Sequence, residues 1–271
     1  MANFVLVHGA WHGGWCWQRV TSALQAQGHR VHALTLTGLG ERAHLLAPGI
    51  TLDTHIDDVI SAIEVEELHD VILAVHSYAG MIGTAVADRL SAPTLSASRD
   101  ALPPEGAVSP WGGPAAKRQT RIKHLVYVDA VVPKPGESWS STQSAATQQQ
   151  RLSAAQATTR FSFPPPDPEV FGLHDADYEW VKRRQTPHPG NTYQAPLDFN
   201  IQRVAAIPRT FVNCTQPALA TIEPSRLRVK DAKFWDGAWL PNSKIVEIKT
   251  GHDPMISEPA ALTQILLDCA K

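Results

Sequence analysis

The sequence predicts an α/β fold built on a mostly parallel, doubly wound sheet. Short apolar runs of the kind that form buried strands recur along the chain, and stretches of helical periodicity lie between them. The predicted strands are residues 4–7, 30–36, 71–75, 122–128, 210–214 and 244–248. Strands that alternate with helices indicate parallel pairing, with helices on both faces of the sheet.

The helices are marked by their ends. The predicted helices are residues 17–26, 51–63, 80–90 and 259–270. The first stops before Gly28, and the second begins at a capping residue, either Thr51 or Asp53. In a sheet of this kind ligands bind beyond the carboxyl ends of the strands. The residues that directly follow each strand are therefore the first candidates for a site.

One long segment interrupts the alternation late in the chain. Residues 133–205 open with Pro133-Lys134-Pro135-Gly136 and contain no strand rhythm. They hold two stretches of helical character, residues 140–158 and 175–184, separated by Pro164-Pro165-Pro166. We interpret this segment as a cap inserted between two strands of one α/β core, which comprises residues 1–132 and 206–271.

A second interruption, residues 91–120, is rich in proline, alanine, serine and glycine. It has little helical or strand character, which is unusual for so long a segment inside a compact domain. We expect a surface insertion loop within the core.

Composition excludes several classes of function. The formal net charge is −2 and no basic face or arm stands out, so we expect no nucleic-acid partner. No apolar stretch approaches the about 18 residues of a membrane span, and the N-terminus lacks the features of a signal peptide, so we expect a cytoplasmic protein without a membrane partner. The three cysteines show no CxxC spacing, and we expect no metal site.

A serine lies between a buried strand and a helix of small residues in Leu73-Ala74-Val75-His76-Ser77-Tyr78-Ala79-Gly80. This is the setting of a nucleophile elbow, where a sharp turn exposes the hydroxyl above the sheet. The usual pattern G-x-S-x-G places small residues two positions before and after the serine. Ala79 nearly meets it, whereas the β-branched Val75 must fit against the turn. We predict that Ser77 is a nucleophile; the alternative is a buried or helix-capping serine.

The first strand runs into a glycine turn in Val5-Leu6-Val7-His8-Gly9-Ala10-Trp11. Gly9 lets the chain turn and leaves the Ala10 N–H free, so that the amides of Ala10 and Tyr78 could form an oxyanion hole. The alternative is a simple strand-end turn. We place Trp11 and Gly9 in the substrate pocket and expect a structural role for His12.

The general base is predicted from its position. His252 follows the last strand directly, in Ile248-Lys249-Thr250-Gly251-His252-Asp253-Pro254-Met255. There it could accept the proton of Ser77 and later return it to the leaving group. Most of the 12 histidines are expected to be structural or solvated. His76 is expected to pack beneath the elbow, and Asp253 to be a turn residue.

The acid of a catalytic triad has more than one candidate. No carboxylate follows strand 210–214 directly, where the chain reads Thr215-Gln216-Pro217. Glu223 lies further on, whereas Asp129 comes directly after the preceding strand and could hold the imidazole from there. We favour Asp129 over Glu223 and over a Ser–His dyad without a carboxylate. The structural alternative for Asp129 is a turn residue that caps a backbone amide.

Together these motifs resemble one branch of the α/β-hydrolase fold, the methyl-salicylate esterases and hydroxynitrile lyases. The segments that carry the resemblance are residues 8–17 and 251–255, with residues 35–42 and 127–130 resembling the bacterial esterase members. The resemblance covers nearly all the chain apart from residues 91–120. It implies the α/β-hydrolase fold and a serine nucleophile.

Within this branch the sequence resembles bacterial esterases that hydrolyse carbendazim, a methyl carbamate on a benzimidazole ring. The resemblance implies a cofactor-independent serine hydrolase that cleaves a carbamate or carboxylic ester. With carbendazim the products would be 2-aminobenzimidazole, methanol and carbon dioxide. The expected partner is a small aromatic substrate.

Other functions stay open at this point. One alternative is a general carboxylesterase for small methyl or aryl esters. A hydroxynitrile lyase would need a lysine near the pocket, and Lys249 is expected inside a strand. A non-catalytic ligand-binding module would have no need of Ser77 and His252. The natural substrate and the oligomeric state, a homo-oligomer included, are not fixed by the sequence.

Overall fold

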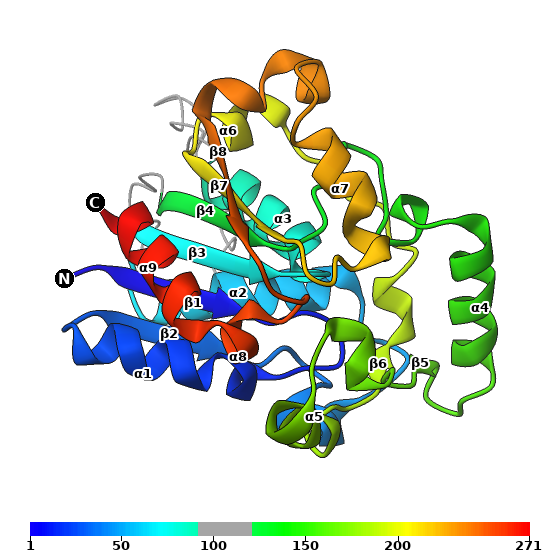
Figure 1. Cartoon of the computed structure of the whole chain (residues 1–271). Helices are drawn as coiled ribbons and strands as arrows, with labels where there is room; N and C mark the ends of the chain where they lie inside the picture. The colour runs from blue at the N-terminus through cyan, green and yellow to red at the C-terminus, as the bar shows by residue number, and fades with distance from the viewer. Residues whose placement is uncertain (92–120) are drawn as a thin grey trace, which may run out of the picture.

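A six-stranded sheet forms the centre of the molecule in a computed structural model that describes residues 1–91 and 121–271 (Figure 1). The strand order is β2-β1-β3-β4-β7-β8, and every neighbouring pair is parallel. The strands are β1 (Asn3–Val7), β2 (Arg30–Leu34), β3 (Val71–His76), β4 (Ile122–Val128), β7 (Arg209–Cys214) and β8 (Ser243–Ile248). The predicted parallel α/β architecture is confirmed, and each strand lies within about two residues of its expected bounds.

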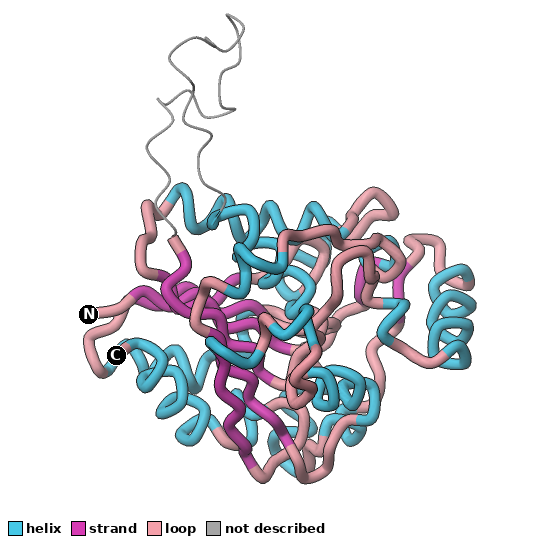
Figure 2. The backbone as a smooth tube through the Cα atoms, turned by 90° about the horizontal axis from the view of Figure 1, so that it is seen from above, coloured by secondary structure: helices cyan, strands magenta, loops and turns pink. Residues whose placement is uncertain are grey.

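Helices cover both faces of this sheet (Figure 2). On one face α1 packs against α9, and on the other α3 packs against α2 and α6. The helices of these two layers are α1 (Gln18–Ala26), α2 (Leu52–Val65), α3 (Ala79–Ser91), α6 (Ile201–Ala205) and α9 (Pro259–Ala270). Thr51 rather than Asp53 caps α2, because the Thr51 hydroxyl accepts from the Thr54 amide while the Thr54 hydroxyl accepts from the Thr51 amide.

The chain between β4 and β7 adds no described strand to the main sheet. It forms α4 (Ala145–Gln156), α5 (Asp175–Lys182) and a small antiparallel pair, β5 (Ser162–Phe163) with β6 (His188–Pro189). Figure 1 shows α4 on the side of the molecule opposite the two termini. The last residues of the predicted cap form α6, which packs against α3 and so belongs to the helices that cover the sheet.

Shorter elements complete the described chain. They are α7 (Glu223–Arg228), α8 (Pro254–Ser257) and the 3₁₀ helices η1 (Gly14–Trp17), η2 (Gly40–Leu45), η3 (Ser140–Thr142), η4 (Pro168–Phe171), η5 (Gly190–Thr192), η6 (Ala220–Ile222), η7 (Phe234–Gly237) and η8 (Leu240–Asn242). Within the described residues, no helix combines the length and the apolar character that a bilayer crossing requires. The predicted insertion at 91–120 lies outside the described residues, apart from Ser91 at the end of α3.

The strand order fixes where a site can form. From β1 the sheet extends to β2 on one side and through β3 to β8 on the other, so the order reverses between β1 and β3. The loops that follow these two strands diverge at the same edge of the sheet and leave a crevice, the place where open α/β sheets bind ligands. Both the predicted oxyanion turn and the predicted elbow lie there.

Candidate active site

Ser77 occupies a sharp turn between β3 and α3. Its φ of 55° is in the left-handed region, which is uncommon for a residue other than glycine. The turn is held by its own carbonyl, which accepts hydrogen bonds from the Gly80 amide at 3.1 Å and the Val131 amide at 2.9 Å. Strained backbone that its surroundings hold in place is typical of functional positions. The structure therefore gives Ser77 the geometry of a nucleophile elbow.

Val75, the departure from the usual elbow pattern, has a compensating partner. Its side chain is fully buried and faces Gly83 of α3. A Cβ on Gly83 would lie only 2.6 Å from Val75 Cγ1, closer than real atoms approach. The space that glycine usually leaves in the strand is thus provided by a glycine in the facing helix. The sequence pattern alone did not reveal this pairing.

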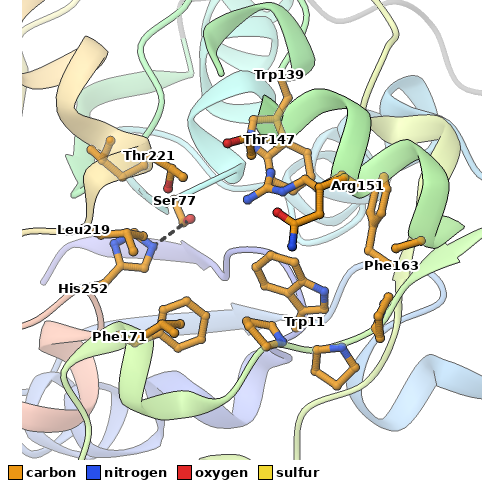
Figure 3. A pocket seen from close by; sticks show the side chains of 17 residues that line it. Trp11, Ser77, Trp139, Thr147, Arg151, Phe163, Phe171, Leu219, Thr221 and His252 are labelled. Carbon is orange, nitrogen blue, oxygen red and sulfur yellow. Dashed lines mark hydrogen bonds between the residues drawn. The ribbon is translucent and has the colours of Figure 1, made fainter. Parts of the chain in front are cut away.

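Three side chains from different parts of the sequence form one hydrogen-bonded chain. His252 Nε2 lies 2.9 Å from Ser77 Oγ (Figure 3). On the other side of the ring, His252 Nδ1 lies 2.7 Å from Asp129 Oδ2. The imidazole and the carboxylate are both buried. A carboxylate at Nδ1 favours a proton on that nitrogen, which leaves the Nε2 lone pair free to accept the serine proton. This is the arrangement of a serine–histidine–acid triad.

Asp129 is held by a cation that the sequence did not predict. Arg226 Nη2, from α7, lies 2.9 Å from both carboxylate oxygens, and the Cys214 amide donates to Oδ1 at 3.3 Å. Charge-assisted bonds of this kind offset the cost of burying the carboxylate. Glu223, the other candidate acid, is half-exposed and approaches Arg226 at 3.5 Å. The structure thus brings Asp129, rather than Glu223, to the imidazole.

Two backbone amides in the turns that follow β1 and β3 belong to buried residues and have no described acceptor. Within the described part of the chain, neither the Ala10 N–H nor the Tyr78 N–H donates a hydrogen bond, although both residues are buried. Buried amides are nearly always paired, so free ones next to a candidate nucleophile suit a developing oxyanion. Gly9 lets the turn after β1 approach the elbow closely, because a Cβ there would lie 2.7 Å from Ser77 Cβ. Gly9 contacts the elbow in this way and is not among the described residues that line the cavity.

Beneath the triad lies a buried ion pair. His12 bridges the oxyanion turn and the base loop, with Nδ1 2.8 Å from the Ala10 carbonyl and Nε2 3.1 Å from Asp253 Oδ2. Burial opposes the charged imidazole, but the Asp253 carboxylate outweighs it and the pKa of His12 is raised. Asp253 is therefore a buried partner of His12 as well as a turn residue. His76 packs beneath the elbow, and its Nε2 donates to the His252 carbonyl at 2.9 Å.

Among the described residues, one group of three side chains in this region could in principle bind a metal ion. His76, His252 and Asp253 place possible ligand atoms within 4.8 Å of one another. Both ring nitrogens of His252 already hydrogen-bond to Ser77 and Asp129, so a metal ion would have to break that chain. The geometry fits proton transfer better than metal coordination.

A cavity of about 450 Å³ opens above Ser77 and His252 (Figure 3). This volume is in the usual range for a small-molecule site. Its walls include four aromatic side chains and a run of prolines, namely Trp11, Trp139, Phe163, Phe171 and Pro164-Pro165-Pro166. Trp11 is thus placed where it was expected. Such walls suit a flat aromatic ligand.

Among the described residues of this wall, Arg151 of α4 is the one arginine or lysine. No sequence pattern predicts it, because α4 is polar and only weakly amphipathic. Lys249 was expected inside the last strand, and this was wrong. It is the first residue after β8, and its side chain is exposed. Arg226 was missed for a similar reason. It meets Asp129 across 97 positions of sequence, and no local pattern marks that contact.

Comparison with known proteins places this geometry in a family. Residues 4–265 match the family model described as "Alpha/beta hydrolase family". The chain is 37% identical to a carbendazim hydrolyzing esterase of Nocardioides sp. (strain SG-4G), over 98% of both chains. It is 25% identical to Methylesterase 7 of Arabidopsis thaliana, over 99% of this chain and 96% of that one.

The solved structures agree on the fold. An extracellular alpha/beta-hydrolase from a Paenibacillus species superposes with a TM-score of 0.74 at 19% identity, over 99% of both chains. Polyneuridine aldehyde esterase superposes with a TM-score of 0.65 at 18% identity, over 100% of both chains. Because the family model matches residues 4–265 and the Nocardioides relative is 37% identical over 98% of both chains, the chain belongs to the alpha/beta hydrolase family.

Proposed function

We propose that this α/β hydrolase is a cofactor-independent serine esterase that cleaves a carbamate or carboxylic ester, with the methyl carbamate of carbendazim as the first candidate substrate. The observation that carries the proposal is the hydrogen-bonded chain Ser77–His252–Asp129 at the base of an aromatic cavity. The 37% identity to a carbendazim hydrolyzing esterase supports the substrate class.

The first half of the reaction forms a carbamoyl-enzyme. His252 Nε2 takes the proton of Ser77 as Oγ attacks the carbonyl carbon of the substrate. The amides of Ala10 and Tyr78 donate to the oxyanion, and one such donor typically contributes about 10²–10³ in rate. Asp129 stabilises the imidazolium that forms. His252 then gives the proton to the departing methoxide, and methanol leaves.

The second half releases the product. A water molecule, deprotonated by His252, attacks the carbamoyl carbon, and the Ser77 oxygen leaves with the proton from the imidazolium. The carbamic acid so formed loses carbon dioxide to give 2-aminobenzimidazole. The aromatic walls would hold the benzimidazole ring through both halves by stacking and burial.

The test is the release of 2-aminobenzimidazole from carbendazim by the purified chain, beside Ser77→Ala. We expect turnover that falls by roughly 10⁶-fold in the variant, as for other serine nucleophiles. Full turnover by Ser77→Ala would show that the serine mechanism is wrong.

A second candidate, a general carboxylesterase, is favoured by the similarity to Methylesterase 7. It would be indicated by hydrolysis of small methyl or aryl esters, abolished in Ser77→Ala, without turnover of carbendazim.

A further inference from the structure

Arg151 is a partly buried cation that lies among aromatic rings. Its guanidinium carbon lies 4.7 Å from the ring centre of Trp139, 5.4 Å from that of Tyr193 and 5.6 Å from that of Trp11. Its Nη1 group is buried and has no hydrogen-bond partner, and no described carboxylate pairs with it. Burial lowers the pKa of Arg151, and the nearby Tyr193 hydroxyl partly opposes this effect.

The surroundings of the guanidinium leave its Nη1 group without an acceptor. A guanidinium has five N–H donors in one plane, and contact with a ring face does not replace an acceptor for each of them. Arg151 lines the same cavity as Ser77 and His252, and Figure 3 shows its side chain directed into that cavity between Trp139 and Trp11. A buried donor of this kind costs free energy until an acceptor reaches it. A ligand in the cavity can supply that acceptor.

We infer that Arg151 is a specificity-determining residue, which donates to an acceptor atom in the plane of an aromatic acyl or carbamoyl group. The inference rests on the proposed function, because it concerns the aromatic part of the substrate that Ser77 attacks. The aromatic walls orient a flat ring, and an in-plane ring nitrogen presents its lone pair along the ring edge. A hydrocarbon ring of the same shape would expel water and leave the Arg151 donors unpaired. Sites built around a hydrogen bond discriminate strongly against analogues that lack the acceptor.

The test uses two substrates that differ by one atom. Methyl N-(quinolin-2-yl)carbamate and methyl N-(naphthalen-2-yl)carbamate have the same shape, but only the first has a ring nitrogen beside the carbamate. The ratio of their kcat/KM values is measured in the wild-type chain, Arg151→Met and Arg151→Lys. Comparing this ratio between variants cancels the intrinsic difference in reactivity.

We expect Arg151→Met to lower the quinoline-to-naphthalene ratio by about tenfold or more, the usual effect of one hydrogen bond to a charged group. Arg151→Lys keeps a charge but not the planar fork, so its ratio should lie in between. The matched control is Arg183→Met. Arg183 is the exposed C-cap residue of α5 and donates to the Glu179 carbonyl of that helix, so the ratio should not change.

A binding measurement decides the question even without turnover. In the Ser77→Ala background, the dissociation constants of the two carbamates are followed by quenching of tryptophan fluorescence, since Trp11 and Trp139 line the cavity. An unchanged ratio in folded Arg151→Met, by rate or by binding, would overturn the inference, as would an equal loss for both ligands. Failure of the proposed function looks different: the wild-type chain would then hydrolyse neither carbamates nor simple esters, while the binding ratio would still report on Arg151.

Discussion

Replacing Asp129 by asparagine preserves the shape of the site but removes one acceptor. In the wild-type chain Oδ1 accepts from the Cys214 amide and from Arg226, neither of which can change from donor to acceptor. Oδ2 also lies 2.9 Å from Arg226 Nη2, but its other partner is His252 Nδ1, whose role depends on the tautomer, so Oδ2 has one fixed donor where Oδ1 has two. The single amide oxygen of asparagine should therefore take the Oδ1 position. The new NH₂ group then points at the imidazole.

In Asp129→Asn this arrangement holds His252 in a tautomer that cannot act as the base. When Nδ1 accepts from the amide, the ring proton moves to Nε2, which lies 2.9 Å from Ser77 Oγ and can no longer take the serine proton. The corresponding change in a serine protease lowers kcat by about 10⁴. We expect a loss of similar size, which corresponds to about 5.5 kcal/mol in activation free energy.

The assay is steady-state hydrolysis of a good ester or carbamate substrate by Asp129→Asn, with Glu223→Gln as the matched control. Glu223 is half-exposed and touches only the far side of Arg226, so its loss should cost less than about threefold. The reasoning is refuted if folded Asp129→Asn keeps more than about a tenth of the wild-type kcat. It is also refuted if Glu223→Gln is the more damaging change.

Two further predictions concern stability. Gly83→Ala should lower the free energy of unfolding by about 1–3 kcal/mol, because its Cβ would meet Val75 Cγ1 at 2.6 Å. Urea denaturation measures this, and adding Val75→Ala should recover part of the loss; a neutral single variant would contradict the packing argument. Burial lowers the pKa of His8 to about 3 and that of His55 to about 4, so both stay neutral in the folded chain but take up protons on unfolding below about pH 6.5. Stability should therefore fall as the pH drops from 6.5 towards 4, by up to about 1.4 kcal/mol per unit for each histidine. Equal urea midpoints at pH 7 and pH 5 would show that this is wrong.

The sequence predicted the elements whose signal is local. Strands and helices carry it in their periodicity. Ser77 carries it in its position directly after β3, and His252 in its position in the loop that follows β8. Choosing between Asp129 and Glu223 required the three-dimensional structure, because each is a carboxylate at a plausible distance along the chain. Contacts between distant segments leave no local pattern. Arg226 contacts Asp129, and Arg151 lines the cavity with Ser77, only because the fold brings α7 and α4 close to residues far away in the sequence.

The contact between Val75 and Gly83 bears on how such enzymes are found. A sharp turn between a strand and a helix brings the two elements close together, so one of them must lack a side chain at the contact. Here the glycine is Gly83 in the helix, eight positions after Val75, and not a residue of the strand. A search for the motif G-x-S-x-G would miss this chain, whereas a search for a glycine in either the strand or the facing helix would find it. A sequence signature of this kind therefore describes only one of the ways in which a chain can leave the space that the turn requires.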